Sequence, residues 1–215
     1  MNYSYPYPHP ALTTDIAVFT LREGRLCVLL IERAEEPYAG AWALPGGFLR
    51  MDETLDACAR RELMEETGVE ASVLFPFANY SEPDRDPRER VISAAYLALM
   101  PFDQMSPRAD SDAAAVQWAH LDDLPQLAFD HADIVDGAQK ALRSRCEAFE
   151  ILFGLLPAKF TLSAFQAAYE AVMGGAADRR NLHTAVLASG LVSETGEMSQ
   201  GRHRPARLFC AAGRP

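Results

Sequence analysis

Hydrophobic runs of strand length alternate with polar loops along the first 150 positions of the sequence. The runs TTDIAVFTL (13–21) and RLCVLLIER (25–33) flank Glu23-Gly24 and predict two paired strands joined by a tight turn. Further strands are predicted in VEASVLFPF, ERVISAAYLALMP and AVQWAHL, and a long helix in HADIVDGAQKALRSRCEAFE. This mixture of strands and helices predicts an α/β or α+β fold.

Helical periodicity replaces this pattern after residue 150, beginning with TLSAFQAAYEAVMGG. Ser163 and Gln166 have the spacing of a capping box at the start of the predicted helix. Its apolar positions follow the i, i+3, i+4, i+7 spacing of one buried face. They are Phe165, Ala168, Tyr169 and Val172.

A second helix is predicted in DRRNLHTAVLASG, with Asp178 as its cap and Gly190 as its stop. Its inner face is expected to contain Leu182, Ala185, Val186 and Ser189. After it, LVSETGEM and RPARLFCA predict a hairpin around the loop SQGRH. Two helices and a basic hairpin within 151–215 predict a small winged-helix-like module.

Charge divides the chain at the same place. Residues 151–215 contain seven Lys or Arg and four Asp or Glu, a balance of +3. The remaining 13 basic and 26 acidic residues give positions 1–150 a balance of -13. Such asymmetry predicts two domains with different partners, 1–150 and 151–215. The total charge of -10 argues against general nucleic-acid binding by the whole chain.

The composition, with 49% hydrophobic residues, is typical of a globular protein, and we expect a cytoplasmic one. No apolar run approaches the ~20 residues of a membrane span, and MNYSYPYPHP lacks the pattern of a secretory signal. The four cysteines are scattered along the sequence without paired spacing, which predicts reduced, mostly buried thiols. They are Cys27, Cys58, Cys146 and Cys210. No metal-ligand spacing links the histidines, so structural or solvent-facing positions are expected for His9, His120, His131, His183 and His203.

The stretch RRELMEETGV (60–69) places three carboxylates on one short helix. At about 100° per residue, Glu62, Glu65 and Glu66 fall within an arc of about 100° and face one point. Carboxylates crowded in this way repel by roughly 3 kcal/mol per pair at an effective dielectric of about 20. A hard divalent cation removes the repulsion, bridges phosphate oxygens and activates water. The alternative is a solvated acidic helix face. The preceding Gly46-Gly47 favours the metal, because glycine lets the backbone approach metal and phosphate closely.

Neighbouring positions complete the pattern G-x5-E-x7-R-E-U-x-E-E-x-G-U, where U is aliphatic. They are Gly47, Glu53, Arg61, Glu62, Leu63, Glu65, Glu66, Gly68 and Val69. With this pattern the sequence resembles the Nudix hydrolase family. The resemblance implies a Nudix α/β/α sandwich with a mixed sheet at 1–150. It also implies Mg2+- or Mn2+-dependent cleavage of nucleoside diphosphates linked to another moiety. In the family the Gly46 carbonyl would join the metal shell, and Arg61, counted with the catalytic residues, would pair with Glu53.

Within this pattern, Glu62 and Glu66 are the expected catalytic metal ligands. Glu65 either ligates as well or only supports its neighbours. In related pyrophosphatases the general base is often a carboxylate on a later loop, which makes Asp112, or its neighbour Asp110, the candidate. A solvated loop aspartate is the alternative for each.

Three further stretches narrow the resemblance. YPHPALTTDIAVF, PYAGAWALPGGF and DPRERVISAAYLAL resemble the Nudix branch of ADP-ribose pyrophosphatases and NrtR regulators of NAD biosynthesis, and Pro83 is compatible with the ADP-ribose subgroup. The substrate-binding candidates are Gly47, Phe48, Arg85 and Arg88. These arginines, with Arg90, either clamp a phosphate group or belong to a solvated basic loop.

The C-terminal stretches LLPAKFTLSAFQAAYEAV, DRRNLHTAVLASGLV and GRHRPARLF resemble the winged helix of NrtR proteins. The resemblance implies a homodimer on a pseudo-palindromic double-stranded DNA operator, with ADP-ribose shifting the DNA affinity. Candidates for major-groove contacts are Arg180, Asn181 and Thr184. Candidates for phosphate contacts from the wing are Arg202, Arg204 and Arg207. An oligomerisation or lid domain is the alternative.

Three functions stay open at this point. The first is an NrtR-like regulator that binds ADP-ribose and hydrolyses it to AMP and ribose 5-phosphate. The second is a plain Mg-dependent Nudix pyrophosphatase whose C-terminal module binds no DNA. The third is a sensor without catalysis. Many NrtR-type regulators have lost residues of the Nudix pattern, whereas here it is intact, which favours catalysis.

Overall fold

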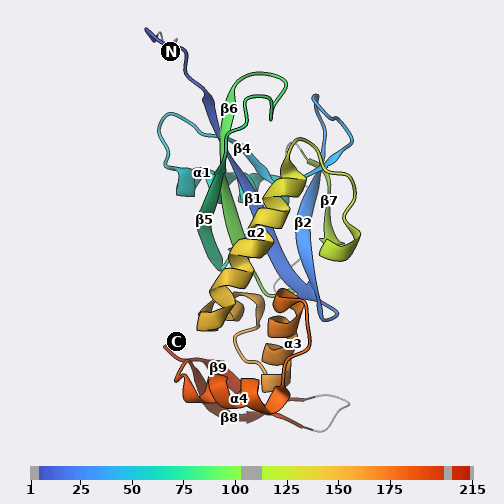
Figure 1. Cartoon of the computed structure of the whole chain (residues 1–215), viewed down its shortest axis with the longest axis vertical. Coiled ribbons are helices and arrows are strands. Elements are labelled where there is room, and N and C mark those ends of the chain that lie inside the picture. The colour runs from blue at the N-terminus through green and yellow to red at the C-terminus, as the bar shows by residue number, and fades with distance from the viewer. Residues whose placement is uncertain (1–4, 103–112, 201–204, 214–215) are drawn as a thin grey trace.

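A computed structural model describes residues 5–102, 113–200 and 205–213 (Figure 1). The strands of the N-terminal part are β1 (Ala11–Arg22), β2 (Arg25–Arg33), β3 (Trp42–Ala43), β4 (Gly46–Phe48), β5 (Val73–Tyr80), β6 (Val91–Leu99) and β7 (Ala113–His120). Its helices are α1 (Leu55–Thr67) and α2 (His131–Arg145), with a 3₁₀ turn η2 (Leu121–Asp123). The rest comprises η3 (Cys146–Ala148), η4 (Glu150–Leu155), α3 (Leu162–Met173), α4 (Arg179–Ala188), β8 (Val192–Met198) and β9 (Arg207–Ala211).

β1 is the centre of a mixed sheet with the order β3-β2-β1-β6-β5, to which β4 and β7 add by pairing with β1 and β2. β1 runs parallel to β6 and antiparallel to β2 and β4. The second half of β1 pairs with β2 across the predicted turn, and its first half pairs with β4. This register places Gly46 and Gly47 directly beside Asp15 and Thr14 of β1.

Both faces of the sheet are covered by helices (Figure 1). Successive residues of β1 point to opposite faces, so Ile16 packs in the cluster that contains Leu63 of α1, and Ala17 in the cluster that contains Ile134 and Ala138 of α2. Burial on both faces explains why β1 and β2 read as continuous apolar runs. The predicted α/β/α sandwich with a mixed sheet is confirmed.

The core under α2 continues without a break into the C-terminal part of the chain. The cluster that contains Leu142 of α2 also contains Phe165, Val172 and Phe209. The Arg143 Nε–H donates to the Val172 carbonyl at 2.8 Å, which joins the end of α2 to the end of α3. Figure 1 shows α2 running from the upper end of the sheet towards α3. The two parts therefore share one hydrophobic core.

The C-terminal part has the predicted helix pair and hairpin. β8 and β9 pair antiparallel, and Phe160 exchanges both backbone hydrogen bonds with Phe209 to add a short third strand. Asp178 caps α4 by accepting from the Asn181 amide at 2.7 Å, as predicted. Gly190 follows the helix at φ 74°, a conformation that glycine adopts without strain.

Some local predictions were wrong. Thr161 caps α3 in place of the predicted Ser163 box, since its hydroxyl accepts from the Ala164 amide at 3.1 Å. On α4, Ala185 and Ser189 are exposed, because the helix contacts the core only through Leu182 and Val186. The helix predicted to reach residue 150 ends at Arg145 and continues as 3₁₀ turns.

The strand predicted from residue 69 starts at Val73. Val69 and Ala71 are buried instead in the cluster between α1 and the sheet. Three of the cysteines are buried and Cys210 is half-buried, all as free thiols, as expected. Within the described ranges, no helix has the length and apolar character needed to cross a membrane.

Candidate active site

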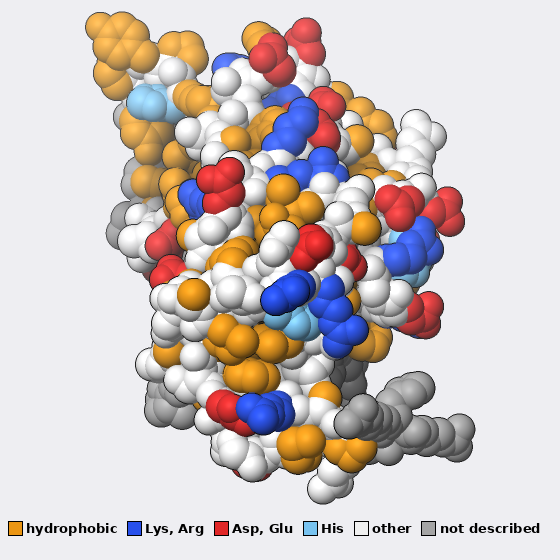
Figure 2. Space-filling view, turned by 60° about the horizontal axis from the view of Figure 1, so that its bottom comes forward, with side chains coloured by type: hydrophobic (Ala, Val, Ile, Leu, Met, Phe, Trp, Pro, Cys, Tyr) orange, Lys and Arg blue, Asp and Glu red, His pale blue; other side chains and the backbone are white. Residues whose placement is uncertain are grey.

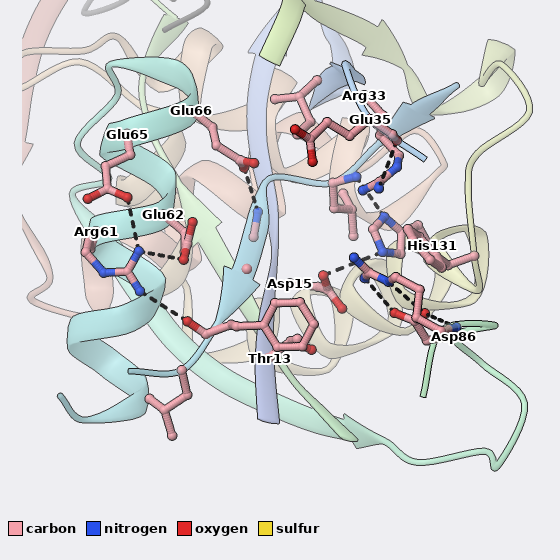
Figure 3. A pocket seen from close by; sticks show the side chains of 18 of the residues that line it. Thr13, Asp15, Arg33, Glu35, Arg61, Glu62, Glu65, Glu66, Asp86 and His131 are labelled. Carbon is pink, nitrogen blue, oxygen red and sulfur yellow. Dashed lines mark hydrogen bonds and ion pairs between the residues drawn. The ribbon is translucent and has the colours of Figure 1, made fainter. Parts of the chain in front are cut away.

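A cavity of about 520 Å³ opens beside the first half of β1 (Figure 3). Figure 3 shows α1 with Glu62 and Glu66 on one side of it, and Arg33, Asp15 and His131 on the other. β4 contributes Gly46, Gly47 and Phe48 to the wall. The cavity thus collects the acidic helix predicted from the sequence together with residues from β1, β2 and α2.

α1 is fixed at both ends. The Thr54 hydroxyl accepts from the Ala57 amide at 3.2 Å, and Gly68 ends the helix in the left-handed conformation at φ 66°. Arg61 binds Glu53 through two hydrogen bonds, at 2.9 Å (Nε–Oε2) and 2.5 Å (Nη2–Oε1). The Arg61 guanidinium lowers the pKa of Glu53 to about 2. The predicted pair therefore ties the helix to the segment before it.

The two glycines of β4 lie very close to neighbouring groups. A Cβ on Gly46, whose φ is 155°, would lie 2.0 Å from the Thr14 carbonyl oxygen. A Cβ on Gly47 would lie 2.5 Å from the Glu62 carboxylate. The Gly46 amide donates to Glu66 Oε2 at 2.8 Å. Both carboxylates therefore lie directly against the glycine backbone.

The carboxylates of α1 differ in their surroundings. Burial raises the pKa of Glu62, against the effect of Arg61, whose Nη1 donates to its Oε1 at 2.5 Å. Glu65 is more exposed and binds Arg61 at 3.1 Å and Arg50 at 3.5 Å. In the described part of the chain, no three His, Cys, Asp or Glu side chains are grouped as a metal site requires. The oxygen donors of Glu62, Glu65, Glu66 and the Gly46 carbonyl nevertheless fit a hard divalent cation in their chemistry.

The opposite wall is a buried polar network that sequence reasoning missed. Arg85 binds Asp130 through Nε at 2.8 Å and Nη2 at 2.6 Å, and Asp15 through Nη2 at 3.1 Å. Asp15 also accepts from the Ser93 hydroxyl at 2.6 Å. One signal for Asp15 was present in the sequence: an acidic residue inside an apolar strand is costly unless it is paired. His131 carried no such signal.

His131 is buried at the start of α2 and is held as a neutral imidazole. Its Nδ1 accepts from the Leu44 amide at 2.9 Å, which places the proton on Nε2, 3.5 Å from Asp15 Oδ1. Burial lowers the pKa of His131, against the opposing effect of the Asp15 and Asp130 charges. This histidine is therefore structural, as expected, but it also lines the cavity.

Acid is expected to destabilise the protein through His131. An unfolded histidine binds a proton below about pH 6.5, whereas the buried ring does so only at lower pH. The unfolded state then binds more protons, so the free energy of unfolding falls as the pH drops below about 6.5, by up to ~1.4 kcal/mol per pH unit. His131→Gln keeps an acceptor and does not titrate. Urea unfolding between pH 5 and 7.5 should give a shallower pH dependence for this variant, and parallel curves would contradict the assignment.

The predicted substrate-binding arginines have different partners. Arg85 lines the cavity, but its Nε and Nη2 already bind carboxylates. Arg88 binds Asp86 and lies 5.3 Å from the Phe48 ring centre and 5.7 Å from that of Phe129. Whether either arginine contacts substrate stays a prediction.

The predicted DNA-contacting residues of α4 are exposed at the end of the molecule remote from the cavity (Figure 1). They are Arg180, Asn181 and Thr184. Figure 2 looks onto this end, where basic and acidic side chains lie among apolar and uncharged ones. Arg207 on β9 pairs with Glu194. The candidates Asp110, Asp112, Arg202 and Arg204 lie outside the described residues.

Two family models match this chain. The NUDIX domain matches residues 11–137, and the NrtR DNA-binding winged helix domain matches residues 152–211. Residues 138–151 lie between the two matches. Together the two matches cover most of the chain.

Three relatives agree with these matches. An ADPR-responsive transcriptional repressor NtrR of Acinetobacter baylyi is 34% identical over 94% of this chain and 82% of its own length. An ADP-ribose pyrophosphatase of Methanocaldococcus jannaschii is 39% identical over 60% of this chain and 73% of its own. Shewanella oneidensis NrtR in complex with a 27mer DNA superposes with a TM-score of 0.83 at 31% identity, over 93% of both chains. The Nudix domain of the same protein, in complex with ADP ribose, superposes with a TM-score of 0.60 at 32% identity, over 66% of this chain and 94% of that one. The chain therefore belongs to the Nudix family, in the NrtR-like branch that joins a Nudix domain to a winged helix.

Proposed function

We propose that this protein is an ADP-ribose-responsive transcriptional regulator whose Nudix domain also hydrolyses ADP-ribose. One observation carries the proposal. The chain combines an intact Nudix pattern beside a cavity with a winged helix whose α4 is exposed, and both parts share one core. The ADP ribose and DNA complexes of Shewanella NrtR support both halves. The likeness to the pyrophosphatase of M. jannaschii supports hydrolysis.

In the proposed reaction, water attacks one phosphorus of the diphosphate and the P–O–P bridge breaks, which gives AMP and ribose 5-phosphate. Glu62, Glu66 and the Gly46 carbonyl, with Glu65 in support, would hold Mg2+ or Mn2+. When bound, the cation neutralises these carboxylates and polarises phosphate oxygens. Arg61 holds Glu62 and Glu65 in position.

The chain's remaining groups orient the ligand and move the proton. Gly47, which has no side chain, lets the Glu62 carboxylate lie directly against the β4 backbone. Asp112 is the proposed general base, which takes the proton of the attacking water. Phe48 and Arg88 form one rim of the cavity and bind the substrate there.

For DNA recognition, we propose that Arg180, Asn181 and Thr184 enter a major groove while Arg202 and Arg204 contact phosphates. A homodimer places two such helices on a pseudo-palindromic operator. The exposure of the three α4 residues supports this role. No ion pair holds Arg180 among the described residues, so its charge is available to DNA.

Arg180→Ala is expected to weaken operator binding by about 5- to 150-fold, since a good side-chain contact to a base contributes roughly 1–3 kcal/mol. Gel-shift titration with DNA from upstream of the protein's own gene, at low and moderate salt, measures the effect. Lys140→Ala is a control with the same loss of charge, because Lys140 lies exposed on α2 and pairs with Asp136. Added ADP-ribose should change the wild-type affinity.

Absence of any shift at low salt, with folded protein, would remove the regulatory half of the proposal. The protein would then be a plain pyrophosphatase, and its winged helix would only stabilise the fold. The shared core favours that second function, because α3 already buries Phe165 and Val172 in the cluster that packs under the Nudix sheet.

A further inference from the structure

Leu187 is a large apolar side chain on the outside of α4. It is 47% exposed, whereas Leu182 and Val186 of the same helix are buried in the core. Leu187 is not among the described residues that form the hydrophobic clusters or pack against them. Packing of the fold therefore does not account for a leucine at this position.

The outward stripe of α4 consists of Arg180, Thr184 and Leu187. Leu187 lies three positions after Thr184 and seven after Arg180, so the three side chains share one side of the helix. All three are exposed, as is Ala188 at the end of the helix. The helix contains no acidic residue after its cap, Asp178. The stripe thus begins with a cation and ends in apolar surface.

The length of the outward stripe matches a short run of base pairs. The seven residues from Arg180 to Leu187 rise about 10 Å, which is about three base-pair steps for a helix that lies along a major groove. α4 follows α3 in the matched DNA-binding winged helix domain, as the recognition helix follows the first helix in helix-turn-helix proteins. Leu187 therefore faces base edges whenever Arg180 and Thr184 do.

A leucine in a major groove distinguishes thymine from the other bases. It has neither donor nor acceptor, so it cannot replace the hydrogen bonds that polar base edges make with water. The apolar group that a base pair presents in this groove is the 5-methyl group of thymine. Exposed leucines are common on protein surfaces, but Leu187 is set apart by its place in line with Arg180 and Thr184.

We propose that Leu187 contacts the 5-methyl group of a thymine in the operator and so selects that base pair. Burial of the methyl group favours thymine, and the unmet hydrogen bonds of a polar base edge disfavour the other bases. This role rests on the proposed DNA-binding function of α4 and adds a base preference to it.

Replacement of thymine by uracil tests this contact without knowledge of the operator sequence. Uracil pairs with adenine as thymine does and differs from it by the 5-methyl group alone. The DNA upstream of the protein's own gene is amplified once with dTTP and once with dUTP, and both fragments are titrated in gel shifts at one salt concentration. Wild type is expected to bind the uracil fragment about 3- to 5-fold more weakly for each methyl group that Leu187 covers, the effect of one buried methyl group.

Leu187→Ala is expected to lower the ratio of the two affinities by about 3-fold or more. Leu12→Ala is the matched control and should keep the wild-type ratio. It makes the same change at a residue that is 40% exposed, at the start of β1 and at the end of the molecule opposite α4 (Figure 1). Changes in DNA flexibility caused by uracil affect every variant alike and cancel when the ratios are compared. Thermal unfolding of Leu187→Ala should match that of wild type, since the side chain is exposed.

A wild-type ratio of one would overturn the proposal while leaving DNA binding by α4 intact. An unchanged ratio in Leu187→Ala would also overturn it, because another residue would then contact the methyl groups. If that variant lost affinity for both fragments equally, Leu187 would belong to an assembly contact instead. Absence of binding to either fragment by folded wild-type protein would remove the DNA-binding function, and the role of Leu187 with it.

Discussion

Glu66→Gln is expected to lower the rate of AMP release from ADP-ribose and Mg2+ by about two to three orders of magnitude, as loss of an electrostatic group at a reacting centre does. The glutamine oxygen can still accept the hydrogen bond that Glu66 receives from the Gly46 amide. What the variant loses is the negative charge that would hold a divalent cation. The measurement is chromatographic separation of AMP from ADP-ribose over time, with folding checked by thermal unfolding.

Glu70→Gln is the matched control for this variant. It makes the same chemical change at an exposed residue two positions after Gly68, the glycine that caps α1. Glu70 does not line the cavity. Unchanged AMP release by Glu66→Gln would exclude Glu66 as a metal ligand. Intact ADP-ribose after long incubation with wild type, together with ligand-dependent thermal stabilisation, would identify a sensor without catalysis.

Arg85→Met is expected to reduce the free energy of unfolding by about 3–5 kcal/mol, the cost of leaving a buried charge without its partner. The substitution removes the ion pairs of Arg85 with Asp15 and Asp130, all inside the protein. Of the side-chain contacts of Asp15 in the described ranges, those with the Ser93 hydroxyl and, at 3.5 Å, with His131 remain. For a chain of this size the loss lowers the unfolding midpoint by about 6–20 °C.

Arg90→Met provides the comparison, since Arg90 lies in the same loop, is exposed and donates, among the described residues, to the carbonyls of Glu82 and Val91. Its effect on stability should stay within about 0.5 kcal/mol. Differential scanning calorimetry of both variants decides the question. Equal midpoints for Arg85→Met and wild type would show that the network does not stabilise the fold.

The acidic side of the cavity was predictable from sequence because its residues are local. Glu53, Arg61, Glu62 and Glu66 lie on one helix and the turn before it, so helical spacing alone brings them together. The pairing of Arg61 with Glu53 was correct in detail. Strand order was partly predictable, because the turn at Glu23-Gly24 fixes the pairing of β1 with β2.

The basic side was predictable only in part: the sequence indicated Arg85 and Arg88, but not the residues from distant segments that surround them. Arg33 ends β2, Phe129 precedes α2 and Arg88 lies in the loop before β6. No pattern within one segment indicates that these side chains meet. The cap of α3 was predicted wrongly for another reason. Thr161 and Ser163 both have side chains that can cap a helix, and the sequence does not show at which of them the folded helix begins.

The unbroken core between the sheet and α3 has a thermodynamic consequence. A winged helix on a flexible tether would melt independently of the domain to which it is attached. Here Leu142, Phe165 and Val172 lie in one cluster, so exposing either side of it strips apolar contacts from the other. The whole chain should then unfold as one cooperative unit. A small molecule that binds only the native cavity therefore raises the melting point of the distant DNA-facing end as well, by mass action alone.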